Sequence, residues 1–461
     1  MQLVAYGAQD VYLTGNPKVT FFQAVYKRHT NFAMELIQQT TNGSPASSGR
    51  VSVTIARNGD LVGNMHVALT PTSNILTSNH NVFDTNWVAE RAIAAVELTI
   101  GGQRIDKHYQ TWWRLYAEVF LNESDKYAWG KMTTMSNPVG NGAATNASPS
   151  KVYLPLLFFF NRNPGLYLPL IALQYHEVRL DFDLTSYYTS YFGTSNPFEV
   201  WANYVYLDTE ERRRFAQKGH EYLIEQVQHT GGDQLDTTGA TTTQLVRLSF
   251  NHPVKELIWC YQNPNASPTA QLNAMWNFTT ATGNVNVTSN ALSFVLSNNY
   301  VAPNITGVPH LAATLGGAGL SVFGLPGATA AAFAGSNYWI ESGSTYYSSN
   351  TGVEVGPLNQ FKVILNGQDR FKEQYGNYFN QVQPFYHHTG TPYPGIYVYS
   401  FALQPEEHQP TGTCNFSRID NAQVSVAMKG SPNAATLQKL FAVNYNILRI
   451  QSGMGGLAFS N

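Results

Sequence analysis

The chain has 461 residues, and its 27 Lys and Arg against 29 Asp and Glu leave a net charge of −2 at pH 7. This near-balance excludes a protein that coats nucleic acid or binds membranes through a polybasic patch, because both need a field of one sign. Charged residues make up only 12% of the chain, about half of their usual share, while 43% of the residues are apolar. The length suits two domains of about 200 residues each, and the composition favours β-sheets with wide loops and surfaces buried against other chains rather than disorder.

The N-terminal sequence MQLVAYGAQDVYLTG has no basic region followed by an apolar one, so we expect no signal peptide and folding in a cytosol. Residues 257–340 contain no Asp, Glu, Lys or Arg. Their most apolar part, 311–335, is interrupted by several glycines and by Pro326, whereas a membrane-spanning helix needs about 20 consecutive apolar residues. We therefore predict a long neutral surface insertion and no transmembrane segment.

Alternation of apolar and polar residues dominates the pattern along the chain and predicts most of its elements. The first clear strand covers residues 51–55, and a turn at 58–60 leads into a second strand over 61–69. Later segments with the same period lie at 178–184, 246–250, 361–365 and 424–428. Many short strands separated by Gly, Pro and Asn turns indicate an all-β protein built as a sandwich or barrel.

Two segments predict helices. Residues 109–121 (YQTWWRLYAEVFL) place their large apolar side chains at spacings of three and four, which is typical of an amphipathic helix. Residues 209–217 (TEERRRFAQ) form a shorter, charged helix with Thr209 as its expected N-terminal cap. Because Glu210 and Glu211 precede the three arginines, we interpret this segment as an ion-paired connector between domains rather than a nucleic-acid patch.

The order of the predicted elements is repeated. ELTIGGQRIDKHYQTWW (residues 97–113) and FKVILNGQDRFKEQYGNYF (361–379) each run from a strand through a Gly-Gln turn into a helix, at an offset of 265 residues. An aromatic strand, a Pro-Gly loop and an alternating strand follow in both halves. We therefore predict two tandem β-sandwich domains that meet near residues 206–219, with Gly101-Gly102 and Asn366-Gly367 forming tight turns that enter the two helices.

Several longer motifs carry a resemblance to a known family. They are GAQDVYLTGNP (residues 7–17), FFQAVYKRHTNF (21–32), IGGQRIDKHY (100–109), LPLIALQYHEVRL (168–180), LNGQDRF (365–371), GTCNFSRIDNA (412–422) and NYNILRIQSGMGGLAF (444–459). Together they resemble the major capsid proteins of large icosahedral nucleocytoplasmic DNA viruses, and in particular those of the algal viruses. The resemblance covers residues 1–255 and those from about 360 to the end, and the stretch between matches no quoted motif.

The resemblance implies a double jelly roll: two tandem eight-stranded sandwiches, with short helices in the loops. It divides the chain into an N-terminal arm (1–26), a first jelly roll (27–212) and a second (213–461) with a charge-free insertion at about 261–359. Three chains would form a pseudo-hexagonal homotrimeric capsomer, which would tile an icosahedral shell with neighbouring capsomers and minor capsid proteins. The family implies no catalysis, no cofactor and no direct contact with nucleic acid, and it places the protein in the virion after assembly in the host cytoplasm.

The resemblance also assigns assembly roles to parts of the chain. The arm would contact neighbouring subunits through Gly7, Asp10, Tyr12, Gly15, Asn16 and Pro17, with Gly15 and Pro17 shaping its turn. We expect the insertion on the outer surface of the capsomer, where host contact or glycans belong. Four of the eight Asn-X-Ser/Thr sequons fall in it and are the glycosylation candidates: Asn265, Asn277, Asn286 and Asn304.

Patterns for metal binding are weak. His176-Glu177 opens like a zincin motif, but Leu180 stands where the second histidine belongs. His387-His388 has no Cys, Asp or Glu nearby in the sequence, so we expect an exposed pair of loop residues rather than a metal site. We expect Cys260 and Cys414 to be small buried thiols, with a single disulfide or an exposed reactive thiol left open.

One pattern leaves a second class of function open. Asp181 and Asp183 point the same way on one predicted strand, close enough for paired carboxylate chemistry or Ca²⁺ binding. A β-sandwich carbohydrate-active enzyme or lectin, with these residues as acid and base, is therefore the alternative to a capsid protein. The simpler interpretation is that they form, with Glu177 and Arg179, the solvated or interfacial face of the strand.

Overall fold

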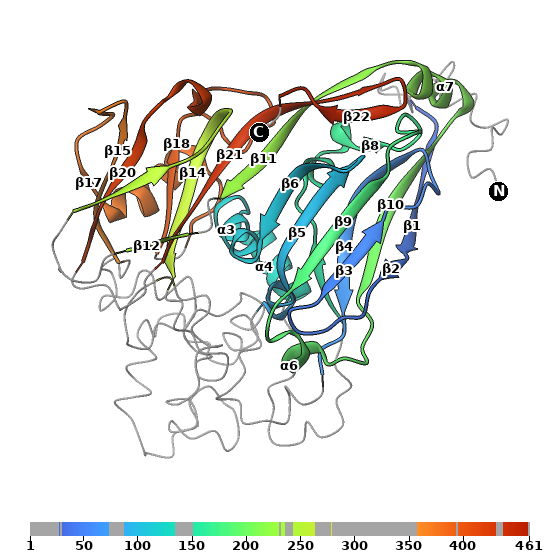
Figure 1. Cartoon of the computed structure of the whole chain (residues 1–461), viewed down its shortest axis with the longest axis horizontal. Coiled ribbons are helices and arrows are strands. Elements are labelled where there is room, and N and C mark those ends of the chain that lie inside the picture. The colour runs from blue at the N-terminus through green and yellow to red at the C-terminus, as the bar shows by residue number, and fades with distance from the viewer. Residues whose placement is uncertain are drawn as a thin grey trace, which may run out of the picture.

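A computed structural model gives the structure of the protein. It describes residues 27, 30–72, 87–133, 151–229, 232–235, 243–262, 278, 357–392, 395–429 and 437–459. The predicted arm (1–26) and nearly all of the predicted insertion lie outside these residues. The described strands form two blocks that lie side by side along the longest axis of the molecule (Figure 1).

The first block consists of two antiparallel sheets. One has the order β1 (Phe32–Gln39), β10 (Glu199–Leu207), β4 (Leu61–Leu69) and β7 (Val152–Pro155), with β8 (Leu168–Pro169) also paired to β4. The other has the order β2 (Thr41–Asn42), β3 (Arg50–Thr54), β9 (Val178–Leu184), β5 (Ile93–Ile100) and β6 (Gln103–Tyr109).

The second block repeats this arrangement. Its first sheet has the order β11 (His220–His229), β21 (Leu437–Gln451), β14 (Pro253–Gln262) and β18 (Ile396–Ser400), and carries in addition β12 (Asp233–Gln234), β19 (Cys414–Asn415) and β22 (Met454–Leu457). Its second sheet has the order β13 (Gln244–Leu248), β20 (Ala422–Met428), β15 (Leu358–Leu365) and β16 (Gln368–Asp369), with β17 (Gln374–Tyr375) also paired to β15. The predicted insertion therefore begins and ends inside strands, because residues 261–262 belong to β14 and 358–359 to β15.

The two blocks share one topology. When the eight main strands of each block are numbered along the chain, both blocks have one sheet of order 1-8-3-6 and one of order 2-7-4-5. This order is that of a jelly roll, in which the chain crosses between two facing sheets. The predicted all-β double jelly roll is confirmed, and we refer to the blocks as the first and second roll.

Helices occupy the connections. The first roll carries η1 (Val88–Arg91), α3 (Gln110–Val119), α4 (Glu123–Thr133), α5 (Phe159–Arg162), η3 (Pro164–Leu166) and α6 (Tyr188–Phe192), and the second carries η7 (Tyr378–Val382), α12 (Gln383–His387) and η8 (Phe416–Arg418). Between the rolls runs α7 (Thr209–Gln217), whose Arg212 pairs with Asp60 of the first roll at 2.9 Å, as the connector prediction requires. The predicted cap was wrong by one residue, because Asp208 accepts the N–H of Thr209 and fills the N-cap position.

The predicted Gly turns are present, but they join strands rather than entering helices directly. Gly101 and Gly102 (φ 58° and 82°) link β5 to β6, and Asn366 and Gly367 (φ 52° and 76°) link β15 to β16. Two consecutive left-handed residues are the geometry of a tight hairpin turn that matches the twist of the strands. Each helix begins only after a further strand, which the sequence pattern did not separate from the turn.

The β11-β21-β14-β18 sheet is buried on both faces. From one face Ile258, Cys260, Phe441 and Val443 join the core of the first roll. From the other face Leu257, Trp259, Leu440 and Ala442 fill the core of the second roll. The two rolls therefore share a continuous apolar interface rather than being joined only by α7.

Candidate assembly surfaces

The interface between the two rolls is built from the first roll's β6 and α3 and the outward face of the second roll's β11-β21-β14-β18 sheet. Aromatic rings form its centre: Phe441 stacks on His229 with centroids 4.2 Å apart, and Tyr109 and Trp112 contact this pair. Each large side chain that is fully buried here contributes roughly 1.5–3 kcal/mol. The helix predicted at 109–121 thus serves as the contact element between the rolls.

Polar groups fix the register of this interface. Gln226 on β11 donates to the carbonyl of Ile105, and the N–H of Val227 donates to Asp106 Oδ1 at 3.1 Å. Lys439 on β21 donates to Thr111 at 3.2 Å. Because apolar contacts allow sliding whereas hydrogen bonds require alignment, these bonds hold β11 in one position along β6.

A buried charge cluster lies beside the aromatic centre. Glu225 on β11 accepts from Arg162 at 2.9 Å and from Lys255 at 2.7 Å, and Lys255 also donates to the carbonyl of Pro405. Burial raises the pKa of Glu225, but the two cations outweigh burial and hold its pKa below the usual range. Arg162 belongs to the first roll and Lys255 to the second, so Glu225 joins the two rolls electrostatically.

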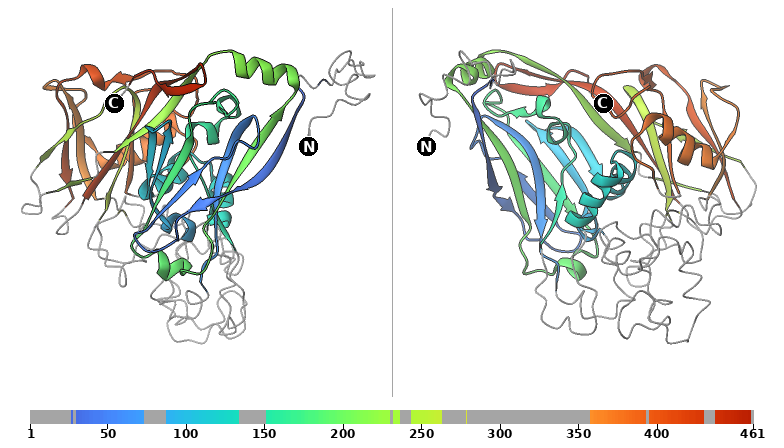
Figure 2. Two further views of the ribbon diagram at one scale, coloured as in Figure 1. Left: turned by 45° about the vertical axis from the view of Figure 1, so that its right-hand side comes forward. Right: turned by 180° about the vertical axis from the view of Figure 1, so that it is seen from behind.

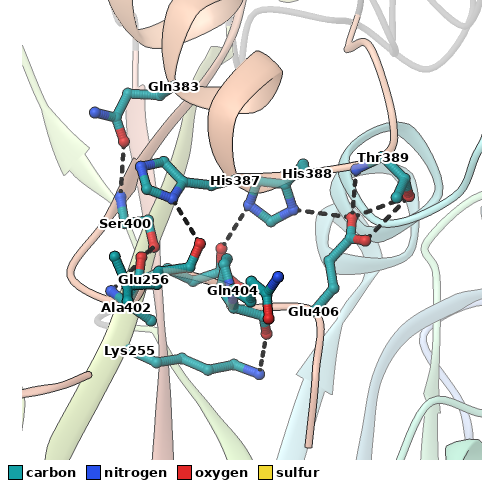
Figure 3. A network of polar contacts seen from close by, with 12 residues as sticks. Lys255, Glu256, Gln383, His387, His388, Thr389, Ser400, Ala402, Gln404 and Glu406 are labelled. Atoms are coloured by element: carbon teal, nitrogen blue, oxygen red, sulfur yellow. Dashed lines mark hydrogen bonds and ion pairs between the residues drawn. The ribbon is translucent and has the colours of Figure 1, made fainter. Parts of the chain in front are cut away.

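A second buried cluster contains His388 (Figure 3). Its side chain is fully buried, with Nε2 2.8 Å from Glu256 Oε2 and Nδ1 3.2 Å from Glu406 Oε1. The expectation of an exposed loop pair was therefore wrong for His388, whose partner Glu256 is distant in sequence and reaches it only in the folded chain. Neighbouring His387 donates from Nδ1 to the carbonyl of Leu403 at 3.0 Å instead.

Burial alone lowers the pKa of His388, but the opposing charges of Glu256 and Glu406 outweigh it and raise the pKa to about 9. The imidazolium is thus the form present at neutral pH, and it neutralises a carboxylate that has no contact with solvent.

The Phe120 ring of the first roll packs edge-on against His388 at 5.3 Å. Nearby, Lys126 of the first roll donates to the carbonyl of Thr391 at 2.6 Å. Residues 388–391 therefore dock the second roll onto the end of α3.

Our sequence interpretation missed both clusters, although a signal was present. The strand PVKELIWCYQ (residues 253–262) places Lys255 and Glu256 inside an otherwise apolar run. Lys and Glu are almost never fully buried unless they are paired, so two charges in a strand of this kind indicate buried ion pairs. The partners themselves, at positions 162, 225, 388 and 406, have no periodic relation to this strand in the sequence.

The outward face of the β3-β9-β5 sheet carries the two candidate catalytic carboxylates, Asp181 and Asp183. Asp183 pairs with Arg50 at 2.7 Å, and Asp181 pairs with Arg179 at 2.8 Å. Both carboxylates thus belong to ion pairs on the charged face of β9, as the simpler interpretation predicted. His176, just before this strand, contacts the backbone of Gly455.

Three further findings concern the candidate residues. Both cysteines are free: Cys260 is buried as expected, but Cys414 is only half-buried. Within the described residues no group of three or more His, Cys, Asp or Glu side chains could hold a metal ion. None of the helices described is long and apolar enough to cross a membrane.

The arm residues Gly7 to Pro17 and the sequon residues Asn265, Asn277, Asn286 and Asn304 lie outside the described part of the chain. Within the insertion, Phe278 is described, and its side chain is fully buried in the core of the first roll. At least this residue of the insertion therefore contributes to packing rather than to an outer surface.

Within the described part of the chain, exposed apolar side chains gather at two places that matter for assembly. The first, which we call the β1 face, is the outward face of the β1-β10-β4-β7 sheet, where Phe32, Met34 and Leu36 are each about half exposed (51%, 48% and 47%). The second, which we call the α12 stripe, lies at the end of η7 and on α12 and consists of Val382, Phe385 and Tyr386, which are 38%, 78% and 71% exposed. Large apolar side chains gathered on a surface mark a site of protein interaction.

Comparison with known proteins gives the family of this architecture. The model of the large eukaryotic DNA virus major capsid protein matches residues 211–456, and that of the major capsid protein N-terminus matches residues 20–208. The chain belongs to this family. Major capsid proteins of Paramecium bursaria Chlorella virus 1 and of Phaeocystis pouchetii virus are 43% and 39% identical to it, each match covering 100% of this chain and 99% of the other.

Solved structures agree. The quasi-atomic model of the PBCV-1 virus capsid is 40% identical in sequence, with a TM-score of 0.71, and covers 96% of this chain and 100% of that one. The Faustovirus major capsid protein, 13% identical with a TM-score of 0.60, shares the fold. The chain is therefore a viral major capsid protein, a structural subunit and not an enzyme, that assembles with neighbouring subunits into a capsid lattice. The alternative of a carbohydrate-active enzyme or lectin finds no support.

Proposed function

We propose that three copies of this major capsid protein form a homotrimeric, pseudo-hexagonal capsomer that tiles an icosahedral shell. One observation carries the proposal: a single chain places two rolls of identical strand order side by side. Three such chains around a threefold axis present six similar rolls, which gives a hexagonal outline from three identical subunits. The capsomers would meet one another and minor capsid proteins in the virion, after assembly in the host cytoplasm.

The mass of the purified chain in solution tests this proposal. Light scattering after gel filtration is expected to give about three times 51.0 kDa, and the species should persist on dilution. Electron microscopy of the same fraction should then reveal hexagonal outlines. A stable species of one chain would contradict the trimer while leaving the family and the fold untouched.

We further propose that the chain divides into the arm (1–26), the first roll (27–212) and the second roll (213–461) with its insertion at about 261–359. The described strands of the first two sheets lie within residues 32–207 and those of the other two within 220–457, which supports a boundary along α7. The arm would contact neighbouring subunits. Deletion of residues 1–26 is expected to leave trimers intact but to prevent their assembly into shells, which sedimentation of assembled particles would measure.

The insertion and its sequons complete the proposal. A neutral segment that lacks the family motifs is suited to the outer surface, where it would carry glycans at Asn265, Asn277, Asn286 or Asn304 and contact the host. Mass spectrometry of protein from virions should detect added hexose mass on peptides of this segment. Peptides with only the unmodified mass would contradict the glycan proposal.

A further inference from the structure

The turn between β3 and β4 carries the pair Asn58-Gly59. In an Asn-Gly sequence the main-chain nitrogen of the glycine can attack the side-chain amide of the asparagine, and glycine has no Cβ to obstruct this approach. The chain contains four such pairs, at Asn42, Asn58, Asn141 and Asn366, and the structure describes all but the one at Asn141. The three described pairs differ in their surroundings, so we expect their reactivity to differ as well.

Two of the described pairs are restrained by hydrogen bonds. Asn366 lies in the turn between β15 and β16, where its Oδ1 accepts the N–H of Asn421 at 3.2 Å and its own N–H donates to the carbonyl of Asn421 at 2.7 Å. Asn42 belongs to β2 and pairs with Ser52 of β3. A ring between the side chain and the main chain forms only if both can rotate, which these contacts oppose.

Asn58 has no such restraint. It is exposed and lies outside the strands, and within the described part of the chain neither Asn58 nor Gly59 takes part in a hydrogen bond. Packing requires the glycine, because a Cβ at position 59 would lie 2.9 Å from the Cβ of Tyr204. The surface therefore presents an unrestrained amide beside a residue that cannot be replaced by a bulkier and less reactive one.

We propose that Asn58 is a site of spontaneous deamidation. The nitrogen of Gly59 attacks Cγ of Asn58, the bond from Cγ to the side-chain nitrogen breaks, and ammonia leaves with the proton from Gly59, which closes a succinimide ring. Water then opens the ring at either carbonyl carbon. One opening leaves an aspartate with a normal main chain, and the other leaves an isoaspartate, in which the main chain runs through Cβ and Cγ and is longer by one carbon. Both products replace a neutral amide with a carboxylate.

The added carbon of the isoaspartate would lie between two fixed points of the chain. On one side, the guanidinium of Arg57 donates to the carbonyls of Gln174 and His176 at 2.7 and 3.0 Å. On the other side, Asp60 is 4% exposed, and its N–H donates to the carbonyl of Val205 at 3.1 Å. A longer main chain between Arg57 and Asp60 must displace one of these two anchors.

Asp60 also anchors the connector between the rolls. Its carboxylate accepts from Arg212 at 2.9 Å and from the N–H of Leu207 at 2.8 Å. Arg212 belongs to α7, the green helix at the top of both views of Figure 2, which lies between the end of the first roll and the strand that enters the second. Deamidation at Asn58 should therefore loosen α7, so that a reaction at the surface acts on the link between the rolls.

Peptide mapping of the purified full-length chain after incubation at mildly alkaline pH tests the reaction. The mass increase of an amide converted to an acid should accumulate at Asn58 at least about tenfold faster than at Asn42 or Asn366, whose contacts must break first. In urea-unfolded chain the three sites should react at similar rates. A rate at Asn42 or Asn366 that matches the rate at Asn58 in the folded chain would refute the proposal, and so would an Asn58 that reacts only after unfolding.

Two variants at this exposed position test the consequence for α7. Asn58→Gln should prevent the reaction, because its longer side chain closes a six-membered ring much more slowly. Asn58→Asp, measured without incubation, adds the charge but leaves the main chain unchanged. After incubation, the amides of residues 207–217 should exchange with deuterium at least about threefold faster in the wild-type chain than in Asn58→Gln.

Fresh Asn58→Asp should exchange like the fresh wild-type chain. Equal exchange in the incubated wild-type and Asn58→Gln proteins would refute the coupling to α7. Faster exchange in fresh Asn58→Asp would refute the role of the lengthened main chain, because the charge alone would then account for the effect.

Discussion

The β1-β10-β4-β7 and β11-β21-β14-β18 sheets have the same strand order, yet they differ in what covers them. The first has one face in the core of its roll and the other partly exposed, whereas the second is buried on both faces. The burial of their strands follows this difference: β14 (PVKELIWCYQ) has eight consecutive buried residues, whereas β1 has one buried residue among its eight. The environment of a sheet in this protein is therefore set by the neighbouring roll as well as by its own topology.

The comparison extends to charge. On the exposed β9 face, Arg50, Arg179, Asp181 and Asp183 form ion pairs in contact with solvent, where such pairs contribute little. At the interface between the rolls, Glu225 and Glu256 are buried and each depends on a cation for neutralisation. Removal of a single partner should accordingly be tolerated on the β9 face and damaging at the interface.

The largest expected difference in stability between the two sheets is at Phe441. Phe441→Ala removes the ring at the centre of the internal interface and is expected to reduce the free energy of unfolding by about 3–5 kcal/mol. Trp201→Ala lies on β10, which has the same place in its sheet as β21 has in the other, and it should reduce the free energy of unfolding by only about 1 kcal/mol. Urea denaturation measures both losses, and equal losses would contradict the difference in cover between the two sheets.

His388 gives the next largest effect, and its dependence on pH distinguishes charge from packing. The pKa of about 9 in the folded chain lies above the ordinary 6.5, so the stabilisation is full below pH 6.5 and is lost as pH rises through 9. His388→Ala should therefore destabilise by about 3 kcal/mol at pH 6 and much less above pH 9.

His387→Ala is the matched control for this measurement, because its ring contacts only a backbone carbonyl in the described hydrogen bonds. It should show a small loss that does not change over the same pH range. A pH-independent loss for His388→Ala, measured by denaturation at both pH values, would show that packing rather than charge accounts for its role.

Gly390 tests how closely the two rolls approach. A Cβ at this position would lie 2.5 Å from the carbonyl oxygen of Leu121 and 2.6 Å from that of Val119, both at the end of α3. Gly390→Ala is therefore expected to cost about 1–3 kcal/mol of unfolding free energy. Gly165→Ala, where the nearest atom is a side-chain oxygen at 3.3 Å, should change thermal stability little, and a similar loss at both sites would argue against tight docking.

The smallest expected loss of stability concerns the Gly turns that the two rolls have in common. Gly102 and Gly367 occupy equivalent turns with φ of 82° and 76°, and a Cβ at either would meet open space. Gly102→Ala and Gly367→Ala should thus each cost about 1 kcal/mol through backbone strain alone. Calorimetry on the single variants would measure the two losses, which should be alike; a clear inequality would mean that the turns are not equivalent.

Most of the fold follows from the sequence because its signals are local. Alternation located β3, β4, β9, β15 and β20, and the Gly pairs located the two hairpin turns. The repeat of these signals predicted two sandwiches, and the family motifs specified the jelly roll. Local signals also led to the errors, since Thr209 and Asp208 are both good caps and only the geometry of the turn selects Asp208.

The interface between the rolls was not predictable in the same way. Glu256 and His388 are separated by more than a hundred residues, and no periodicity relates them. Lys255 and Glu256 in β14 indicate buried ion pairs, but the sequence does not tell which segments supply their partners. Contacts of this kind depend on how two finished sheets meet, which the sequence of neither sheet specifies alone.

Hydrogen–deuterium exchange of the Phe441→Ala variant tests most directly the claim that the two rolls share one apolar interface. Phe441 lies on β21 of the second roll, and its ring contacts Tyr109 and Trp112 of the first roll. The account predicts that amides of residues 103–119 in the first roll, as well as those of 220–229 in the second, exchange faster than in the wild-type chain, while those of β9 do not change. Faster exchange that is confined to the second roll would contradict it.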